Sequence, residues 1–228
     1  MRIGAGLAAA GAVHVGPAAA PVVPPIARAL RIPLTIPAPG VGITFDDGPH
    51  PEGTAATLEI LARASVPATF FLAGEQVERY PSLAGEIVAA GHEVALHCHR
   101  HRNQLRLTPR QIVSDMRTGE AAIAEATGRP PRLFRPPYGI FSAAGLAIAR
   151  RHYQPMLWSR WGRDWRGDAT PSSIGARAGR GARAGDVILL HDADHYSAAG
   201  SWRNTVAALP LLLDELDRAG RLPVAIPQ

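Results

Sequence analysis

Two adjacent carboxylates, Asp46 and Asp47, follow a short apolar run and stand directly before a Gly-Pro turn. Like charges so close together raise each other's pKa unless a metal ion or a fixed arginine compensates them. His97 and His101 follow later in the chain, and histidines at this spacing share one side of a helical turn or of a strand. One carboxylate with two imidazoles forms the ligand set of a hydrolytic zinc site that keeps a coordination position open. These residues therefore predict metal-assisted hydrolysis.

Three further polar stretches support this prediction, because each comes after an apolar run. They contain Arg135, Asp164 and His191. An Asp pair on its own is more typical of a turn, and a His-rich stretch on its own is typical of a solvated surface. The joint occurrence of all five stretches favours a catalytic site over both structural interpretations.

Short apolar runs alternate with longer amphipathic segments from residue 41 onward, a pattern typical of βα units around a parallel sheet or barrel. The predicted strands lie near residues 41–45, 67–72, 93–97, 132–135, 154–158, 186–190 and 222–226. The predicted helices lie near residues 54–65, 76–90, 108–127, 143–152, 170–183 and 204–219. Each polar stretch falls at or beyond the carboxyl end of a predicted strand, the edge where active sites assemble in such folds.

The chain resembles the polysaccharide deacetylases of carbohydrate esterase family 4, the group defined by similarity to the rhizobial nodulation chitooligosaccharide deacetylase. The matching motifs are Thr44 to Gly48, His97 to His101, Arg135 to Gly139, Asp164-Trp165 and Leu189 to His191. They occur in the family's order and cover roughly residues 41 to 225. The resemblance implies an α/β fold of the distorted (β/α)7 barrel type, which agrees with the predicted strands.

The resemblance also implies a metal site and a general base. Asp47, His97 and His101 would hold Zn²⁺ or another divalent metal such as Co²⁺. Asp46, kept off the metal and paired with Arg135, would act as the general base on a water molecule. Spacing alone does not distinguish the roles of the two aspartates.

The remaining motif residues would complete the chemistry of amide hydrolysis. The backbone N–H of Tyr138 would stabilise the oxyanion, and His191 would donate a proton to the leaving amine. Asp164 would orient or tune either His191 or the arginine of the third motif. Trp165 and Leu189 would line the pocket for the acetyl methyl group, although large aromatic residues are also commonly buried as plain core packing.

Cys98 and His99 depart from the expected pattern or complicate it. The family usually has Ser or Thr where this chain has Cys98. A thiolate can ligate zinc, but strand alternation would turn Cys98 away from the side of His97. His99 would share a face with both metal histidines if the strand continued, and it could replace one of them. The family spacing favours His97 and His101.

Composition indicates one globular domain, since 46% of the 228 residues are hydrophobic and 19% are charged. The net charge of +5 comes from scattered arginines. No basic-aromatic module for reading bases is present, so we expect no nucleic-acid partner, whereas an anionic cell envelope fits. Cys98 is the only cysteine, so an intrachain disulfide is excluded. We expect a monomer.

Residues 1–40 are rich in Pro and Ala and are predicted to form an irregular lead-in to a catalytic domain at residues 41–228. Arg2 precedes an apolar stretch at residues 3–13, and Ala18 to Ala20 could supply a cleavage site. A secretory signal, a membrane-proximal anchor and an unstructured extension all fit this pattern. We expect an extracellular or envelope-associated protein, and a cytoplasmic one is also compatible.

The predicted function is metal-dependent removal of N-acetyl groups from the amino sugars of a polysaccharide or oligosaccharide, with release of acetate. Chitooligosaccharide, peptidoglycan and an extracellular polysaccharide all carry the required acetamide, and O-acetyl esters also suit the chemistry. One alternative is hydrolysis of a non-sugar amide or cyclic imide on the same barrel. The other is a non-catalytic carbohydrate-binding or cell-wall protein, for which the chain would have no need to keep a base, a metal set and an acid together.

Overall fold

Seven parallel strands form one curved sheet in the computed structural model, which describes residues 13–227. Their order across the sheet is β5-β4-β3-β2-β1-β7-β6. The strands are β1 (Gly42–Asp46), β2 (Thr69–Leu72), β3 (Glu93–Leu96), β4 (Leu133–Phe134), β5 (Gln154–Pro155), β6 (Arg160–Trp161) and β7 (Val187–His191). Because β5 and β6 stand at the two ends of this order, the barrel is open along one side. The predicted parallel α/β barrel is confirmed in this open form.

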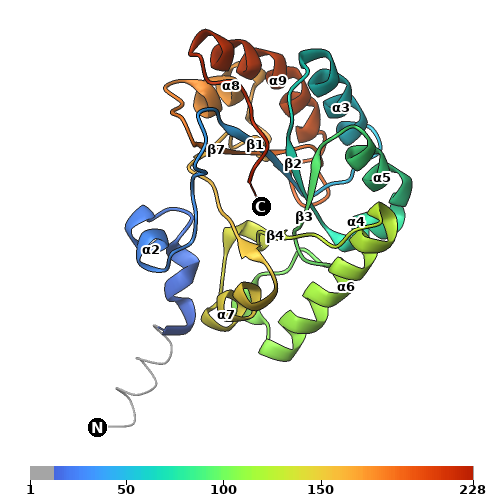
Figure 1. The fold of residues 1–228 in the computed structure, drawn as a ribbon, viewed down its shortest axis with the longest axis vertical. Coiled ribbons are helices and arrows are strands. Elements are labelled where there is room, and N and C mark those ends of the chain that lie inside the picture. Colours follow the sequence, from blue (N-terminus) through green and yellow to red (C-terminus); the bar gives the residue numbers. More distant parts are fainter. Residues whose placement is uncertain (1–12, 228) are drawn as a thin grey trace.

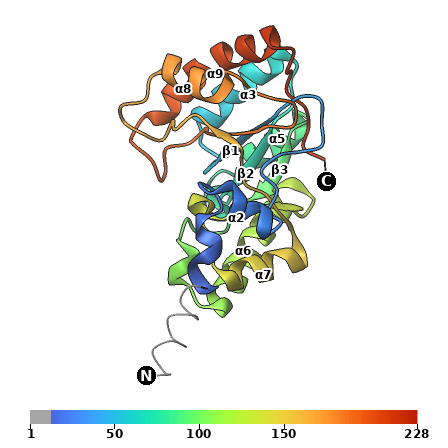
Figure 2. The same cartoon turned by 90° about the vertical axis from the view of Figure 1, so that its left-hand side faces the viewer.

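Helices pack around the outside of the sheet (Figure 1). They are α2 (Pro24–Ala29), α3 (Gly53–Ala64), α4 (Gly74–Arg79), α5 (Pro81–Ala89), α6 (Pro109–Thr127), α7 (Ala143–His152), α8 (Pro171–Gly179) and α9 (Ser201–Arg218). Three short 3₁₀ helices are η1 (Gly16–Ala19), η2 (Gln104–Arg106) and η3 (Pro137–Gly139). Figure 2 shows α3, α8 and α9 together at one end of the molecule and α6 and α7 at the other. The carboxyl ends of the strands remain free to carry a site.

The central strands are buried on both faces, as expected for a parallel sheet covered by helices. Every residue of β1 and β2 is buried. Phe45 of β1 stacks on Phe70 of β2 with ring centroids 5.1 Å apart. Thr44 is a polar residue in the middle of β1, and its hydroxyl donates to the carbonyl oxygen of Ile188 in β7 at 2.8 Å. This bond gives the buried hydroxyl proton an acceptor.

Two predicted elements differ from the structure. The strand predicted at residues 222–226 is wrong, because only a single bridge between Val41 and Pro223 forms there. Pro223 has no N–H to donate to a strand ladder. The seventh strand is instead the two-residue β6, whose shortness left no periodic signal. The helix predicted at residues 76–90 is divided into α4 and α5, because Pro81 cannot continue α4 and starts a new helix.

The described part of the predicted lead-in, residues 13–40, packs against the barrel and contains η1 and α2, which the prediction of an irregular segment did not include. Ala20 and Ala27 have no exposed surface. Pro21 lies so close to Gly139 that a Cβ there would be 2.9 Å from the Pro21 Cγ. The carbonyl oxygen of Pro33 accepts from the N–H of Leu157 at 3.0 Å. These contacts bring the segment next to the strand ends.

Arg2 and nearly all of the predicted apolar stretch at residues 3–13 lie outside the described residues. Within residues 13–227, the helices are too short or too polar to span a bilayer.

Thr108 is expected to stabilise α6 through a reciprocal cap. Its hydroxyl accepts from the N–H of Gln111, whose side chain accepts from the N–H of Thr108. Replacing Thr108 with Ala should lower the free energy of unfolding by about 1 kcal/mol, measured by urea denaturation. Thr118→Ala is the matched control inside the same helix, and it should cause no such loss because Ala favours helix interiors. Equal effects of the two changes would contradict the role of the cap.

Candidate active site

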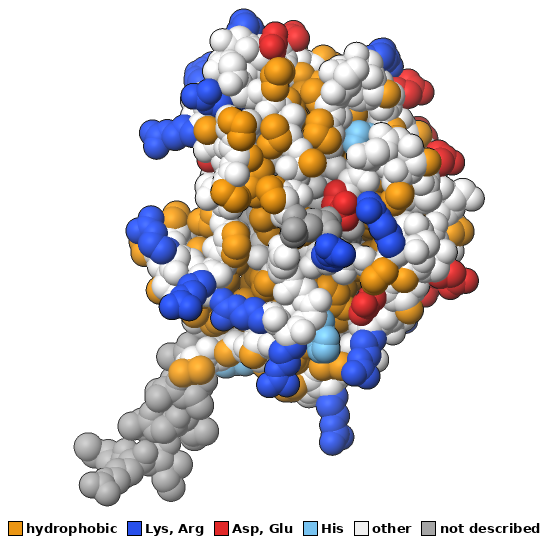
Figure 3. Space-filling model, viewed as in Figure 1, with side chains coloured by type: hydrophobic (Ala, Val, Ile, Leu, Met, Phe, Trp, Pro, Cys, Tyr) orange, Lys and Arg blue, Asp and Glu red, His pale blue; other side chains and the backbone are white. Residues whose placement is uncertain are grey.

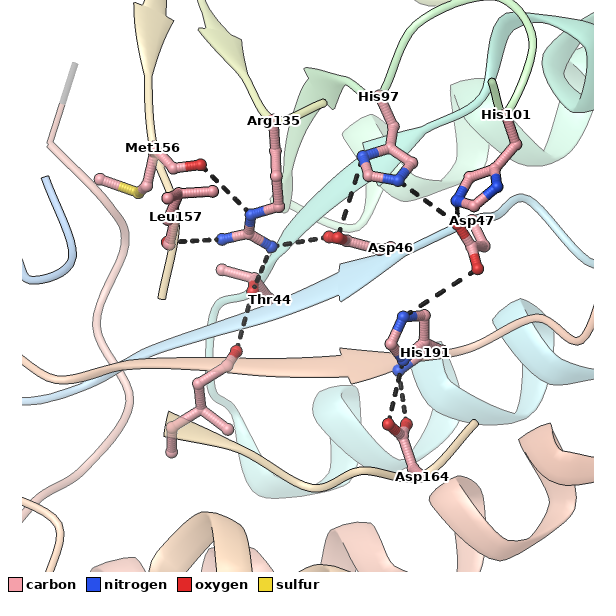
Figure 4. Close-up of polar contacts among 11 residues, drawn as sticks. Thr44, Asp46, Asp47, His97, His101, Arg135, Met156, Leu157, Asp164 and His191 are labelled. Carbon is pink, nitrogen blue, oxygen red and sulfur yellow. Dashed lines mark hydrogen bonds and ion pairs between the residues drawn. The ribbon is translucent and has the colours of Figure 1, made fainter. Parts of the chain in front are cut away.

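A pocket of about 300 Å³ lies at the carboxyl ends of the strands and gathers most of the predicted site residues. Its lining includes Asp46, Asp47, His97, His101, Tyr138, Trp165, Leu189 and His191. Arg135 and Asp164 lie behind this lining and have no exposed surface. Figure 4 shows the polar groups converging from β1, β7 and the segments that follow β3 and β4.

Arg135 follows β4 and is held by acceptors on several sides (Figure 4). Its Nη1 donates to Asp46 Oδ1 at 2.6 Å and to the Thr44 hydroxyl oxygen at 2.9 Å. Its Nη2 donates to the carbonyl oxygen of Leu157 at 3.0 Å, and its Nε donates to that of Met156 at 3.4 Å. The guanidinium is therefore fixed in place, and it fixes one oxygen of Asp46.

Asp46 is a buried carboxyl. Arg135 engages its Oδ1, and its Oδ2 faces the pocket region. Its Oδ2 lies 3.8 Å from His97 Nδ1. Burial raises the pKa of Asp46 above its usual value, and the nearby Arg135 opposes that rise. A carboxylate that is fixed on one side and has a raised pKa is suited to act as a general base.

Asp47, His97 and His101 form a cluster of groups that could hold a metal ion, with ligand atoms within 4.8 Å of one another. The Nε2 atoms of both histidines lie 3.4 Å from Asp47 Oδ1. Burial lowers the pKa of His97 well below its usual value, and burial together with His97 lowers the pKa of His101 to about 3. Both imidazoles are therefore neutral at neutral pH.

The geometry of this cluster fits a cation. Asp47 Oδ1 is buried and has no hydrogen-bond partner among residues 13–227. Two neutral imidazoles and one carboxylate thus direct acceptor atoms toward a common point, and buried acceptors in such an arrangement are costly unless a cation joins them. The donor set is also one that divalent transition metals prefer.

Left-handed backbone occurs at two residues in the segments that carry these side chains. Asp47 has φ of 78° and Cys98 has φ of 73°. In a regular strand, successive side chains point to opposite faces, so Asp46 and Asp47 would diverge. The turn at Asp47 interrupts this alternation, and both carboxylates reach the same pocket. Asp tolerates this conformation better than most residues.

Cys98 and His99 lie outside the metal cluster. β3 ends at Leu96, so strand alternation does not govern the residues that follow. Burial, with the neighbouring Asp115, raises the pKa of the Cys98 thiol well above its usual value, which disfavours a thiolate ligand. The His99 backbone N–H donates to Asp115 Oδ2 at 3.0 Å, and its ring lies toward Glu78.

His191, at the end of β7, is paired with Asp164. Its Nδ1 lies 3.0 Å from Asp164 Oδ1, and its backbone N–H donates to Oδ2 at 2.6 Å. The Thr205 hydroxyl also donates to Oδ2, at 2.8 Å. Burial alone would lower the pKa of His191, but the carboxyl groups of Asp164, Asp47 and Asp46 together outweigh it and raise the pKa to about 10. His191 is therefore a protonated imidazole in the pocket lining, and the partner of Asp164 is the histidine.

A family model for polysaccharide deacetylases matches residues 35–156, which is more than half of the chain. The chain belongs to the polysaccharide deacetylase family. The matched region contains the aspartate pair, the two metal-cluster histidines and Arg135.

Individual polysaccharide deacetylases agree with this assignment. The chain is 36% identical over 184 residues to a peptidoglycan-N-acetylglucosamine deacetylase of Bacillus cereus, covering 79% of this chain and 83% of the relative. It is 38% identical over 208 residues to a chitooligosaccharide deacetylase of Sinorhizobium fredii, covering 84% and 92%. A crystal structure of a peptidoglycan N-acetylglucosamine deacetylase superposes with a TM-score of 0.80 at 28% identity and covers 86% of this chain and 91% of that one.

Aromatic rings form one wall of the pocket in this polysaccharide deacetylase. Trp158, Trp161 and Trp165 follow one another, with ring centroids 5.7 Å and then 5.4 Å apart. Trp165 also meets His191 edge-on at 5.4 Å. Tyr138 has φ of 61°, and its side chain remains 55% exposed. Trp158 and Trp161 were not among the predicted site residues, although Trp161 stands beside the Asp164 motif.

Several supporting residues gave no clear signal in the sequence. Asp115 of α6 is 6% exposed and accepts from the backbone N–H groups of His99 and Arg100, in the loop at residues 97–101 that carries both metal-cluster histidines (the metal-cluster loop). In the sequence it resembles an ordinary acidic residue of a helix. Thr205 of α9 and Tyr196 lie outside the motifs, although Tyr196 follows His191 closely in the sequence. Thr44 could have been noticed as a polar residue within an apolar run.

The metal cluster predicts that His101→Ala weakens binding of a divalent ion by more than about 100-fold, because loss of a direct ligand costs more than loss of a supporting contact. Isothermal titration of the chelator-treated protein, with Zn²⁺ as the probe ion, measures this. His99→Ala is the matched control from the same loop and should keep the wild-type Kd. Weaker binding by His99→Ala and unchanged binding by His101→Ala would reverse the ligand assignment.

Proposed function

We propose that this protein is a metal-dependent hydrolase that removes N-acetyl groups from amino sugars of a polysaccharide or oligosaccharide and releases acetate. The observation that carries the proposal is the combination of three groups of residues in one site. These are a ligand cluster of one carboxylate and two neutral imidazoles, a buried carboxylate fixed by Arg135, and a protonated His191 fixed by Asp164. Hydrolysis of an acetamide needs all three.

Asp47, His97 and His101 would hold Zn²⁺ or another divalent ion such as Co²⁺. When bound, the ion would supply Lewis-acid activation in the pocket. The neutral state of both histidines supports this role, because a protonated imidazole cannot ligate a metal.

Asp46 would accept the proton of the attacking water. Its Oδ1 is engaged by Arg135, so Oδ2 is the oxygen that takes the proton. The water oxygen would first bond to the acetyl carbon and place negative charge on the carbonyl oxygen, and the carbon–nitrogen bond would break when the carbonyl re-forms. His191 would donate its Nε2 proton to the departing amine, while Asp164 holds the opposite ring nitrogen. The products are acetate and a free amino sugar.

The remaining predicted residues would bind and orient the acetyl group. The backbone N–H of Tyr138 would stabilise the developing oxyanion. Trp165 and Leu189 line the pocket and would contact the acetyl methyl. The tryptophan wall offers a flat apolar surface of the kind that an extended sugar chain can cover, which favours a glycan over a small closed amide.

A polymer of N-acetylglucosamine units is the substrate class that the relatives support. Those relatives are named as chitooligosaccharide and peptidoglycan-N-acetylglucosamine deacetylases. Such substrates would place the protein at the cell envelope or outside the cell. The catalytic unit would comprise residues 41–228, on which residues 13–40 pack.

Removal of the metal should abolish activity reversibly. We expect the chelator-treated protein to release no acetate from chitooligosaccharides or peptidoglycan fragments, and the same protein to regain release after Zn²⁺ is restored. Enzymatic detection of acetate measures both states. Absence of release from either substrate, with one ion bound per chain, would contradict the proposed substrate class.

Asp46→Asn should separate catalysis from metal binding. The change removes the proton acceptor, so we expect kcat to fall by about 10²- to 10⁴-fold, the usual contribution of a general base. The Zn²⁺ content should stay near that of the wild type, because Asp46 is not in the metal cluster. Circular dichroism provides the control for folding. Loss of the ion together with activity would show that Asp46 is a ligand.

A further inference from the structure

His101 lies between two aromatic rings from different parts of the chain. Its ring stacks on Tyr196 with centroids 4.3 Å apart and an interplanar angle of 8°. Tyr138 meets it edge-on at 4.5 Å. The Tyr196 contact is the closer and the nearly parallel one, so it limits how far the imidazole can rotate out of its plane.

His101 has little other support for its ring orientation. It lies in the loop after β3, outside any regular element. A metal-binding histidine usually donates its second ring N–H to a carboxylate or carbonyl, and this contact sets the ring plane. In residues 13–227, His101 Nδ1 is buried and finds no protein partner. Aromatic packing is therefore the contact that remains to orient this ligand.

Tyr196 is itself fixed by α4. Its hydroxyl donates to Glu75 Oε1 at 2.5 Å and accepts from Gln76 Nε2 at 3.0 Å. Gln76 is 2% exposed, so its side chain is an immobile donor. Burial raises the pKa of the Tyr196 hydroxyl, which keeps it protonated and able to donate to Glu75.

The same helix holds the backbone of the metal-cluster loop. The N–H of Gly74 donates to the carbonyl oxygen of Cys98 at 2.9 Å, and the N–H of Glu75 donates to that of His99 at 3.0 Å. The amino end of α4 thus fixes the loop that carries His101 and, through its side chains, the ring that stacks on His101.

From this arrangement we propose that Tyr196 is a positioning residue that holds the His101 imidazole in its metal-binding orientation. The proposal rests on the metal site of the proposed function. Tyr196 lies in the loop between β7 and α9, shortly after His191. The loop that follows His191 would therefore also support His101, a ligand from the opposite part of the pocket.

The test compares Zn²⁺ affinity in variants that keep or remove the aromatic ring. Tyr196→Ala should raise the Kd for Zn²⁺ about 10-fold, within the range typical of residues that support a metal ligand. Tyr196→Leu retains side-chain bulk without a planar ring and should show a similar rise, which keeps the test valid if the Ala variant folds poorly. Tyr196→Phe keeps the stacked ring but loses the hydroxyl bonds to Glu75 and Gln76, so its Kd should rise less than that of Tyr196→Ala.

Tyr80→Ala is the control for general disturbance of α4, because Tyr80 ends that helix and is not in the pocket lining. It should leave the Kd unchanged. Metal-free melting temperatures of all variants are compared, so that lower stability is not mistaken for lower affinity. If both Tyr196→Ala and Tyr196→Leu bind Zn²⁺ with wild-type affinity, the inference is overturned. This holds even if the KM for the oligosaccharide rises in these variants. A wild-type protein that binds no Zn²⁺ would overturn the metal site itself.

Discussion

The buried ion pair of Arg135 and Asp46 constrains much of this structure. A guanidinium with no exposed surface is tolerated only when its N–H groups find acceptors, because an unpaired buried charge is very costly. Those acceptors come from β1 and from the carbonyl oxygens at residues 156 and 157. β1 and the segment at residues 156–157 must therefore each keep a fixed distance from Arg135. The same condition places Asp46 at the pocket with one oxygen already engaged.

Around this pair, the pocket shifts the pKa values of its histidines in opposite directions. Burial, with cationic neighbours, keeps His97 and His101 neutral. The carboxyl groups of Asp164, Asp47 and Asp46 keep His191 protonated despite similar burial. One residue type thus supplies two neutral imidazoles and a protonated one, because the charged groups around each ring differ. Figure 3 shows arginines at separate places over the visible face of the molecule. The opposite pKa shifts arise from burial and from charged groups within the site.

Site residues could be predicted from the sequence wherever a polar motif followed an apolar run. The positions of Asp46, His97 and His191 at strand ends follow from strand-helix alternation, and the parallel fold makes those ends meet. The left-handed turn at Asp47 was not predictable, because most residues reach that conformation only when tertiary contacts impose it. Supporting contacts such as Tyr196 on His101 join distant segments and have no local pattern. The two-residue β6 was too short to show periodicity.

The contact between Pro33 and Leu157 has a consequence for how catalytic units of this kind can be exchanged between proteins. Leu157 donates its N–H to Pro33 and offers its carbonyl oxygen to Arg135, so this one residue links the N-terminal segment to the pocket. The family model begins at residue 35 and excludes Pro33. A chain that began at residue 35 and kept Leu157 would leave the Leu157 N–H without this acceptor. Support for the pocket therefore extends upstream of residue 35.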